Sequence, residues 1–143
     1  MSIGLWVRGA RPKTLATSIA SVMVGAVMAY MHIERSGTCI AIYPEPASCA
    51  TAREQQTLLM DRFWPVTILC LLVALFLQIA VNYANDYSDG IRGTDAGRDT
   101  DESKSGKPQR LTASGLVPAK HVLFAAMICA AIACICGIAA IVI

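Results

Sequence analysis

Three apolar segments, each close to the length of a membrane-crossing helix, dominate the chain. They are Thr14–Ile33, which carries no charge, Phe63–Val81 and Val122–Ile143. A helix needs about 20 apolar residues to cross a bilayer, and it satisfies its own backbone hydrogen-bonding groups in lipid. The segments therefore predict an all-α transmembrane helix bundle with spans over residues 14–33, 63–83 and 121–143. The hydrophobic content of 55% agrees with this class.

Basic residues lie mainly on one side of the predicted spans. Arg8, Arg11 and Lys13 precede the first span, and residues 84–120 carry Arg92, Arg98, Lys104, Lys107, Arg110 and Lys120. Segment 34–62, which has two prolines, offsets its arginines with acidic residues and reads as an irregular outer loop. Residues 84–118 read as an Asp-rich loop, and the positive-inside bias places this loop and the N-terminus in the cytoplasm. We expect a multi-pass protein of the cell (inner, cytoplasmic) membrane whose partner is the lipid bilayer, with no nucleic acid.

The six cysteines show no spacing typical of a metal site. Cys70, Cys129, Cys134 and Cys136 fall within predicted spans, where a cysteine packs as a small apolar residue. Cys39 and Cys49 share the outer loop. Either a disulfide or two free thiols fits that placement.

The second span leads directly into a polar motif, Asn85-Asp86-Tyr87-Ser88-Asp89, with Asp95 soon after. Carboxylates at the mouth of a membrane helix are costly to leave uncompensated, so they indicate a functional site. If the helix continues past Val81, side chains turn by about 100° per residue, and two amides and two carboxylates share an arc of roughly 100°. These four residues are Asn82, Asn85, Asp86 and Asp89. The motif therefore predicts a cation site directly above the span.

Magnesium prefers such oxygen ligands and completes its octahedron with water and substrate phosphates. At a membrane surface, a suitable phosphate ligand is a lipid diphosphate, which the metal would turn into a leaving group. Other metal motifs fit poorly. An EF-hand read from Asp99 would place Lys104 and Arg110 where glycine and glutamate are needed.

Two stretches of the chain resemble the UbiA superfamily of intramembrane aromatic prenyltransferases. Residues 85–95, NDYSDGIRGTD, resemble the first Asp-rich motif of that family, and residues 110–115, RLTASG, resemble the stretch that follows it. Residues 11–15, RPKTL, resemble the segment that opens the first helix. The motif is most similar to that of the 1,4-dihydroxy-2-naphthoate prenyltransferases of menaquinone synthesis. Gly93 stands at the third Asp position of the general superfamily motif, and Asp95 comes two residues later.

The resemblance implies an Mg²⁺-dependent enzyme that transfers a polyprenyl group from polyprenyl diphosphate to 1,4-dihydroxy-2-naphthoate. The acceptor also loses its carboxylate, which gives demethylmenaquinone. Asp86 and Asp89 would be catalytic; the implied metal ligands are Asn85, Asp86, Asp89 and Asp95. The implied substrate-binding residues are Asn82, Lys107, Arg110, Arg11 and Lys13. The family fold has about nine helices, so we expect residues 1–143 to form the N-terminal part of a single domain of this type.

Three other interpretations stay open at this point. The enzyme could use another aromatic acceptor within the same superfamily. A transporter or channel could use the Asp cluster as a cation gate, although such a gate favours acidic groups deep within the spans. The chain could also be a fragment without activity of its own.

Overall fold

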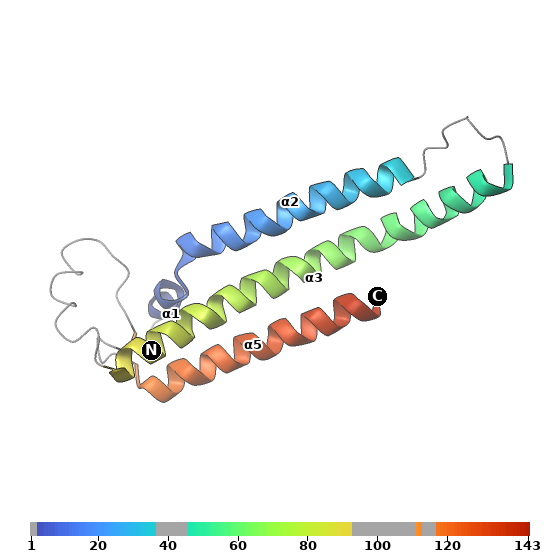
Figure 1. Ribbon diagram of the computed structural model, residues 1–143. Helices are drawn as coiled ribbons and strands as arrows, with labels where there is room; N and C mark the ends of the chain where they lie inside the picture. The colour runs from blue at the N-terminus through green and yellow to red at the C-terminus, as the bar shows by residue number, and fades with distance from the viewer. Residues whose placement is uncertain (1–2, 37–45, 93–110, 113–116) are drawn as a thin grey trace.

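The computed structural model describes residues 3–36, 46–92, 111–112 and 117–143. Its described helices are α1 (Ile3–Gly9), α2 (Pro12–Ser36), α3 (Pro46–Arg92) and α5 (Ala119–Val142). Helices α2, α3 and α5 run side by side as long rods with α3 in the middle, and short α1 lies beside the C-terminal end of α3 (Figure 1). The predicted all-α bundle is confirmed over the described residues.

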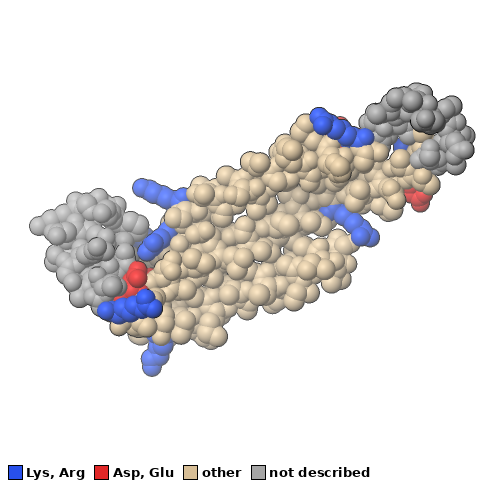
Figure 2. Space-filling view, in the orientation of Figure 1, with Lys and Arg blue, Asp and Glu red and all other residues tan. Residues whose placement is uncertain are grey.

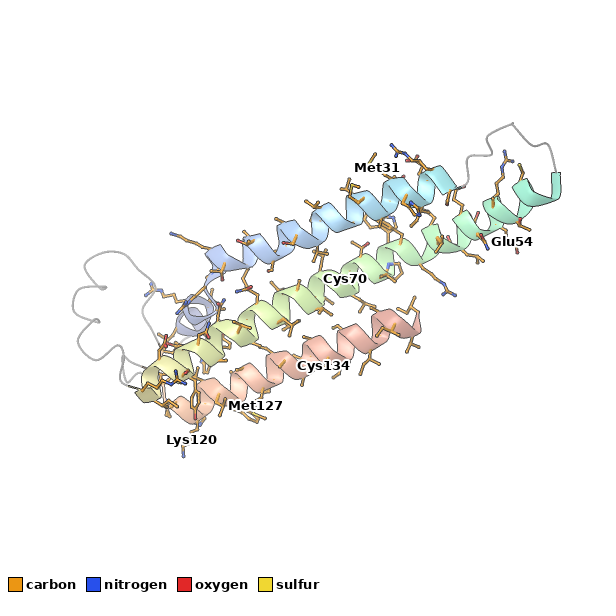
Figure 3. All side chains as sticks on the ribbon, in the orientation of Figure 1. Met31, Glu54, Cys70, Lys120, Met127 and Cys134 are labelled. Carbon is orange, nitrogen blue, oxygen red and sulfur yellow. The ribbon has the colours of Figure 1, made fainter. Side chains whose placement is uncertain are left out.

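Three of these helices, α2, α3 and α5, are long and apolar enough to cross a membrane. On the face shown in Figure 2, charged side chains gather toward the two ends of the molecule and leave an uncharged band between them. Glu54 lies at one end and Lys120 at the opposite end (Figure 3). The apolar surface of this band suits a hydrocarbon environment, because the backbone groups inside each helix already pair with one another.

The helix bounds correct two expectations about the loops. Helix α2 extends to Ser36 and α3 begins at Pro46, so residues 46–62 are helical instead of forming an irregular outer loop. Pro46 occupies the first helical position, where its missing N–H is harmless, and Ala, Glu, Gln and Leu residues of high helix propensity follow it. At its other end α3 continues to Arg92, so residues 84–92, which were expected to belong to the Asp-rich loop, are helical.

The cysteines divide between the two environments that the sequence suggests. Cys70, Cys129, Cys134 and Cys136 are free and lie on α3 and α5. Cys49, near the start of α3, is disulfide-bonded. Cys39, its candidate partner from the sequence, lies outside the described residues.

The packed core of the described chain lies at the end of the bundle that carries the polar motif. Leu111, Val117 and Val122 are its largest fully buried side chains, and they cluster with Tyr83. The Trp6 ring of α1 meets Tyr83 edge to face, with ring centroids 5.6 Å apart. The Tyr83 hydroxyl donates a hydrogen bond of 3.0 Å to the Trp6 carbonyl. Helix α2, by contrast, has no buried residue.

Toward the other end, an apolar groove of about 630 Å³ lies between α2, α3 and the end of α5. Gly25 lines the groove on α2, and a Cβ added there would meet no atom within 4 Å. Cys70 lines it on α3, about three helical turns before Asn82. The groove and the packed core are therefore separate parts of the molecule.

Replacing Leu111 with alanine is expected to destabilise the packed end. A leucine that is fully buried typically loses about 2–5 kcal/mol of stability on truncation, because the neighbours close the cavity only in part. Leu58→Ala is a matched control, since Leu58 is exposed on α3. Denaturation in detergent micelles measures both variants, and equal stability of the two would contradict the assignment of Leu111 to the core.

Candidate functional site

Two buried polar residues, Asn82 and Asp86, lie one turn apart on α3. Each is only 3% exposed, although both sit near the end of a membrane-length helix. The four polar residues predicted to lie together share one arc only if the helix continues past Val81. Helix α3 is continuous from Pro46 to Arg92, so this condition is met. A spacing of four residues places both side chains on the same helix face. Buried polar groups need hydrogen-bond partners, and each residue binds the main chain of a different segment.

Asn82 connects α3 to the turn between α1 and α2. Its amide nitrogen donates to the Ala10 carbonyl at 2.7 Å and to the Thr14 hydroxyl at 3.0 Å. The Thr14 hydroxyl donates in turn to the Arg11 carbonyl at 2.9 Å. The side-chain oxygen of Asn82 accepts a longer hydrogen bond of 3.4 Å from the Gln78 amide nitrogen. Asn82 thus contacts both sides of the turn that contains Arg11.

The turn itself has an unusual backbone. Arg11 adopts a φ of 53°, in the left-handed region that non-glycine residues rarely enter. Such a conformation costs about 1–3 kcal/mol and persists only where the surroundings hold it. Pro12 follows and begins α2, and a residue before proline is disfavoured in the right-handed helical region. The two bonds from Asn82 hold the turn against α3, and backbone bonds from Arg11 N–H to the Arg8 carbonyl (3.1 Å) and from Thr14 N–H to the Arg11 carbonyl (2.9 Å) hold it from within.

Asp86 binds the segment that returns toward α5. Its Oδ2 accepts a hydrogen bond of 2.9 Å from the backbone N–H of Leu111. The Leu111 carbonyl accepts a bond of 3.3 Å from the N–H of Val117, so the main chain on both sides of Leu111 is held. A bond from an amide to a carboxylate is charge-assisted and stronger than one between neutral groups.

Two glycines make room for this return segment. A Cβ added to Gly9 of α1 would lie 2.5 Å from Leu111 Cδ1 and 2.9 Å from Leu111 Cγ. A Cβ added to Gly90 of α3 would lie 2.5 Å from the Cβ of Thr112, and closer still to its methyl group. Real Cβ atoms essentially never approach other atoms so closely. A side chain at either glycine would therefore force residue 111 or 112 to shift.

The other predicted site residues differ in exposure, and three of them lie outside the described residues. Asn85 is exposed and Asp89 is half-buried, so these two and Asp86 span the boundary between the packed core and the surface. Arg11 is half-buried, and Lys13 is exposed in the first turn of α2. Asp95, Lys107 and Arg110 lie outside the described residues. In the part of the chain that the structure describes, no group of three or more His, Cys, Asp or Glu side chains could hold a metal ion.

Charges at this end of the molecule are mixed. The end of α3 that carries the motif lies near the start of α5 and near α1 (Figure 1), and the described basic residues in and beside these segments are Arg8, Arg11, Lys13, Arg92 and Lys120. Red and blue side chains accordingly appear together at this end in Figure 2. An end with both signs of charge can bind a divalent cation and an anion together, since each neutralises the other.

The sequence did not indicate two features of this site. The backbone N–H of Leu111 cannot be identified as a ligand of Asp86 from residue types, because every residue except proline carries that group. The roles of Gly9 and Gly90 depend on which segment packs against them. One signal was available: a glycine inside a helix, four residues after a buried Asp, suggests a close approach of another segment.

The structure thus defines a polytopic α-helical membrane protein with a carboxylate-bearing site at one end of its central helix. Three curated proteins are similar to the chain, and each is named 1,4-dihydroxy-2-naphthoate octaprenyltransferase. The protein from Mycobacterium tuberculosis is 36% identical over 138 residues, which covers 96% of this chain and 35% of the relative. The protein from Mycobacterium leprae is 34% identical over 139 residues, with the same coverage of 96% and 35%. The protein from Haemophilus influenzae is 28% identical over 118 residues, which covers 82% of this chain and 28% of the relative.

These relatives confirm the resemblance to UbiA-type prenyltransferases that the Asp-rich motif indicated. The chain spans about a third of the length of the two mycobacterial relatives. No protein-family model matches the chain. No solved structure matches it significantly.

Asn82→Ala is expected to loosen the turn that contains Arg11. The variant leaves the buried Ala10 carbonyl without its donor, which typically costs about 1–3 kcal/mol. Hydrogen exchange of residues 10–14 in detergent or nanodiscs should accelerate. Asn85→Ala is the matched control because Asn85 is exposed on the same helix. Unchanged exchange in Asn82→Ala would show that Asn82 does not hold the turn.

Proposed function

We propose that the protein transfers a polyprenyl group from polyprenyl diphosphate to 1,4-dihydroxy-2-naphthoate, with decarboxylation, to give demethylmenaquinone in its reduced, quinol form. The observation that carries this proposal is the buried carboxylate of Asp86 at the end of a membrane-length helix, within the motif that resembles the prenyltransferase motif. Support comes from the three similar proteins that carry this activity in their names. A site at the end of a membrane-length helix suits a substrate with a long apolar tail and a charged head.

The donor set fits a hard divalent cation, and we assign Mg²⁺ to it. Carboxylate and amide oxygens of Asn85, Asp86 and Asp89 would hold the ion, with Asp95 as a further ligand. Magnesium keeps several waters and uses only one or two carboxylates besides substrate phosphates, so a compact cage of protein ligands is not required. When bound, the ion neutralises the diphosphate and makes it a better leaving group.

The contacts of Asp86 prepare it for this use. A ligand is effective when other groups fix its orientation, and the N–H of Leu111 fixes one oxygen of Asp86. Burial of the carboxylate strengthens its attraction for a cation, because the surroundings screen charge less than water does.

Basic residues on both anchored segments would bind the substrates. Lys107 and Arg110 would contact the diphosphate, and Arg110 directly precedes Leu111 in the sequence. Arg11 and Lys13 would attract the acceptor carboxylate. Asn82 belongs to the site as well, through the bonds that hold the turn at Arg11. Arginine suits both substrates, since its planar donors match the oxygens of phosphates and carboxylates.

The reaction needs one bond to break before another forms. The bond between the first prenyl carbon and oxygen breaks, and its electron pair leaves with the diphosphate. The electron-rich naphthoate ring then forms a carbon–carbon bond to the allylic cation, and the acceptor carboxylate departs as carbon dioxide. Such a cation reacts with water, so the apolar surroundings of the site serve to keep water away from it.

The orientation of the chain is part of the proposal. We place the motif end in the cytoplasm, because basic residues favour that side. The disulfide of Cys49 lies toward the opposite end of α3 and suits an oxidising compartment outside the inner membrane.

Asp89→Asn is expected to reduce prenyl transfer at least about a hundredfold, because the site loses a charged oxygen ligand that acts on the leaving group. Membrane insertion should be unaffected. Asp61→Asn is the matched control, since Asp61 is an exposed acid in the N-terminal half of α3, well away from Asp89. The assay follows radiolabelled prenyl diphosphate into naphthoate product with Mg²⁺ present. Near-normal turnover by Asp89→Asn would exclude its proposed role.

Cysteine labelling tests the proposed orientation. In a background without native cysteines, Glu54→Cys should react with a membrane-impermeant maleimide in intact cells. Lys120→Cys should react only after permeabilisation, because the two positions lie at opposite ends of the molecule (Figure 3). The reverse labelling pattern would contradict the assignment of the motif to the cytoplasm.

A further inference from the structure

The geometry points to Gly90 as a positioning residue for Asp86. It contacts no substrate in this proposal; it acts by admitting the return segment onto α3, so that the N–H of Leu111 reaches the carboxylate. The consequence for catalysis rests on the proposed function, whereas the consequence for the hydrogen bond does not.

Register along α3 connects the two residues. Gly90 follows Asp86 by four positions, so both lie on the same helix face one turn apart. Two consecutive residues, 111 and 112, lie along this face, so that each one meets one of the two α3 positions. The N–H of Leu111 lies over Asp86 at 2.9 Å, and the Thr112 side chain lies over Gly90. A dipeptide laid along the helix face thus makes both contacts together.

The contact at Gly90 tolerates no side chain. The two atoms that an added Cβ would meet first are the Cβ and Cγ2 of Thr112, and the third is Thr112 Oγ1 at 3.5 Å. Rotation about χ1 of Thr112 moves the methyl group but leaves its Cβ in place. An alanine at position 90 therefore displaces the backbone of Thr112, and Leu111 moves with it.

Among the described residues, the close contacts at Gly90 come from the side chain of Thr112. The three nearest atoms all belong to its side chain, and the third is already at ordinary van der Waals distance. Removing that side chain leaves no nearer atom for an alanine at position 90 to meet. The effect of Gly90→Ala should therefore depend on Thr112, which provides a rescue variant.

Gly9 supports the same segment from α1. Its missing side chain admits Leu111, which is fully buried against Gly9 and Tyr83. Because the Leu111 side chain is already enclosed there, the segment has little freedom to escape a new clash at Gly90. Two glycines on separate helices thus fix the position of one backbone N–H.

Amide hydrogen exchange on the chain in nanodiscs tests the positioning without any activity. Gly90→Ala should accelerate exchange at the Leu111 amide about ten- to one-hundredfold, as expected for the loss of a charge-assisted hydrogen bond. Gly25→Ala is the matched control: it is the same substitution in a helix, at a position where the new Cβ meets no atom. It should change Leu111 exchange less than about twofold, within the spread expected for a surface substitution.

The Thr112→Gly background keeps the test decisive if Gly90→Ala also destabilises the whole fold. In that background, adding Gly90→Ala should change Leu111 exchange less than about threefold, because the obstruction is gone. Equal effects of Gly90→Ala with and without the Thr112 side chain would overturn the proposal. So would a Leu111 amide that remains protected in Gly90→Ala.

The Mg²⁺ dependence of prenyl transfer provides a second, separate test. Gly90→Ala should raise the Mg²⁺ concentration for half-maximal rate about tenfold, and Thr112→Gly should suppress this change, since a misplaced ligand weakens metal binding. A metal requirement that Gly90→Ala leaves unchanged in an active protein would overturn the positioning role. If the unmodified protein transfers no prenyl group, the proposed function fails, and the exchange result still decides whether Gly90 positions Asp86.

Discussion

The hydrogen bond between the Leu111 N–H and the Asp86 carboxylate is the interaction on which the motif end of the molecule depends. A carboxylate that is 3% exposed at the end of a membrane helix is stable only if fixed donors or a cation replace its water. The bond meets part of that need and joins α3 to a segment 25 residues away in sequence. Leu111, Val117 and Val122 then complete a core around it. The hydrogen bond and the apolar core therefore stabilise the same end of the bundle.

Asn82 and Asp86 connect α3 to two other segments by hydrogen bonds of opposite direction. Asn82 acts as a donor and holds a carbonyl of the turn before α2. Asp86 acts as an acceptor and holds an amide of the segment before α5. The central helix thus sets the positions of both neighbouring spans at one end, where Arg11 and Arg110 adjoin the held backbone groups in sequence. Away from this end the helices pack more loosely, and α2 buries no residue at all.

The sequence predicted the elements of the fold better than their ends or contacts. The three apolar runs gave the spans, because hydrophobic length is a direct consequence of bilayer thickness. Segment 34–62 was expected as a loop because of its two prolines and mixed charges, yet Pro46 begins a helix within it. The arc of Asn82, Asn85, Asp86 and Asp89 followed from helical periodicity alone. The anchoring of Asn82 by Ala10 and of Asp86 by Leu111 could not follow from it, because such bonds depend on how distant segments pack.

The most direct test of the central claim, that the motif binds a divalent cation together with a diphosphate, is Mn²⁺ binding followed by electron paramagnetic resonance. The chain in nanodiscs is titrated with Mn²⁺ in the presence of inorganic pyrophosphate. We expect tight binding that requires pyrophosphate and that weakens at least about tenfold in Asp86→Asn/Asp89→Asn, since two charged ligands are lost. Equal Mn²⁺ affinity in that double variant would contradict the account.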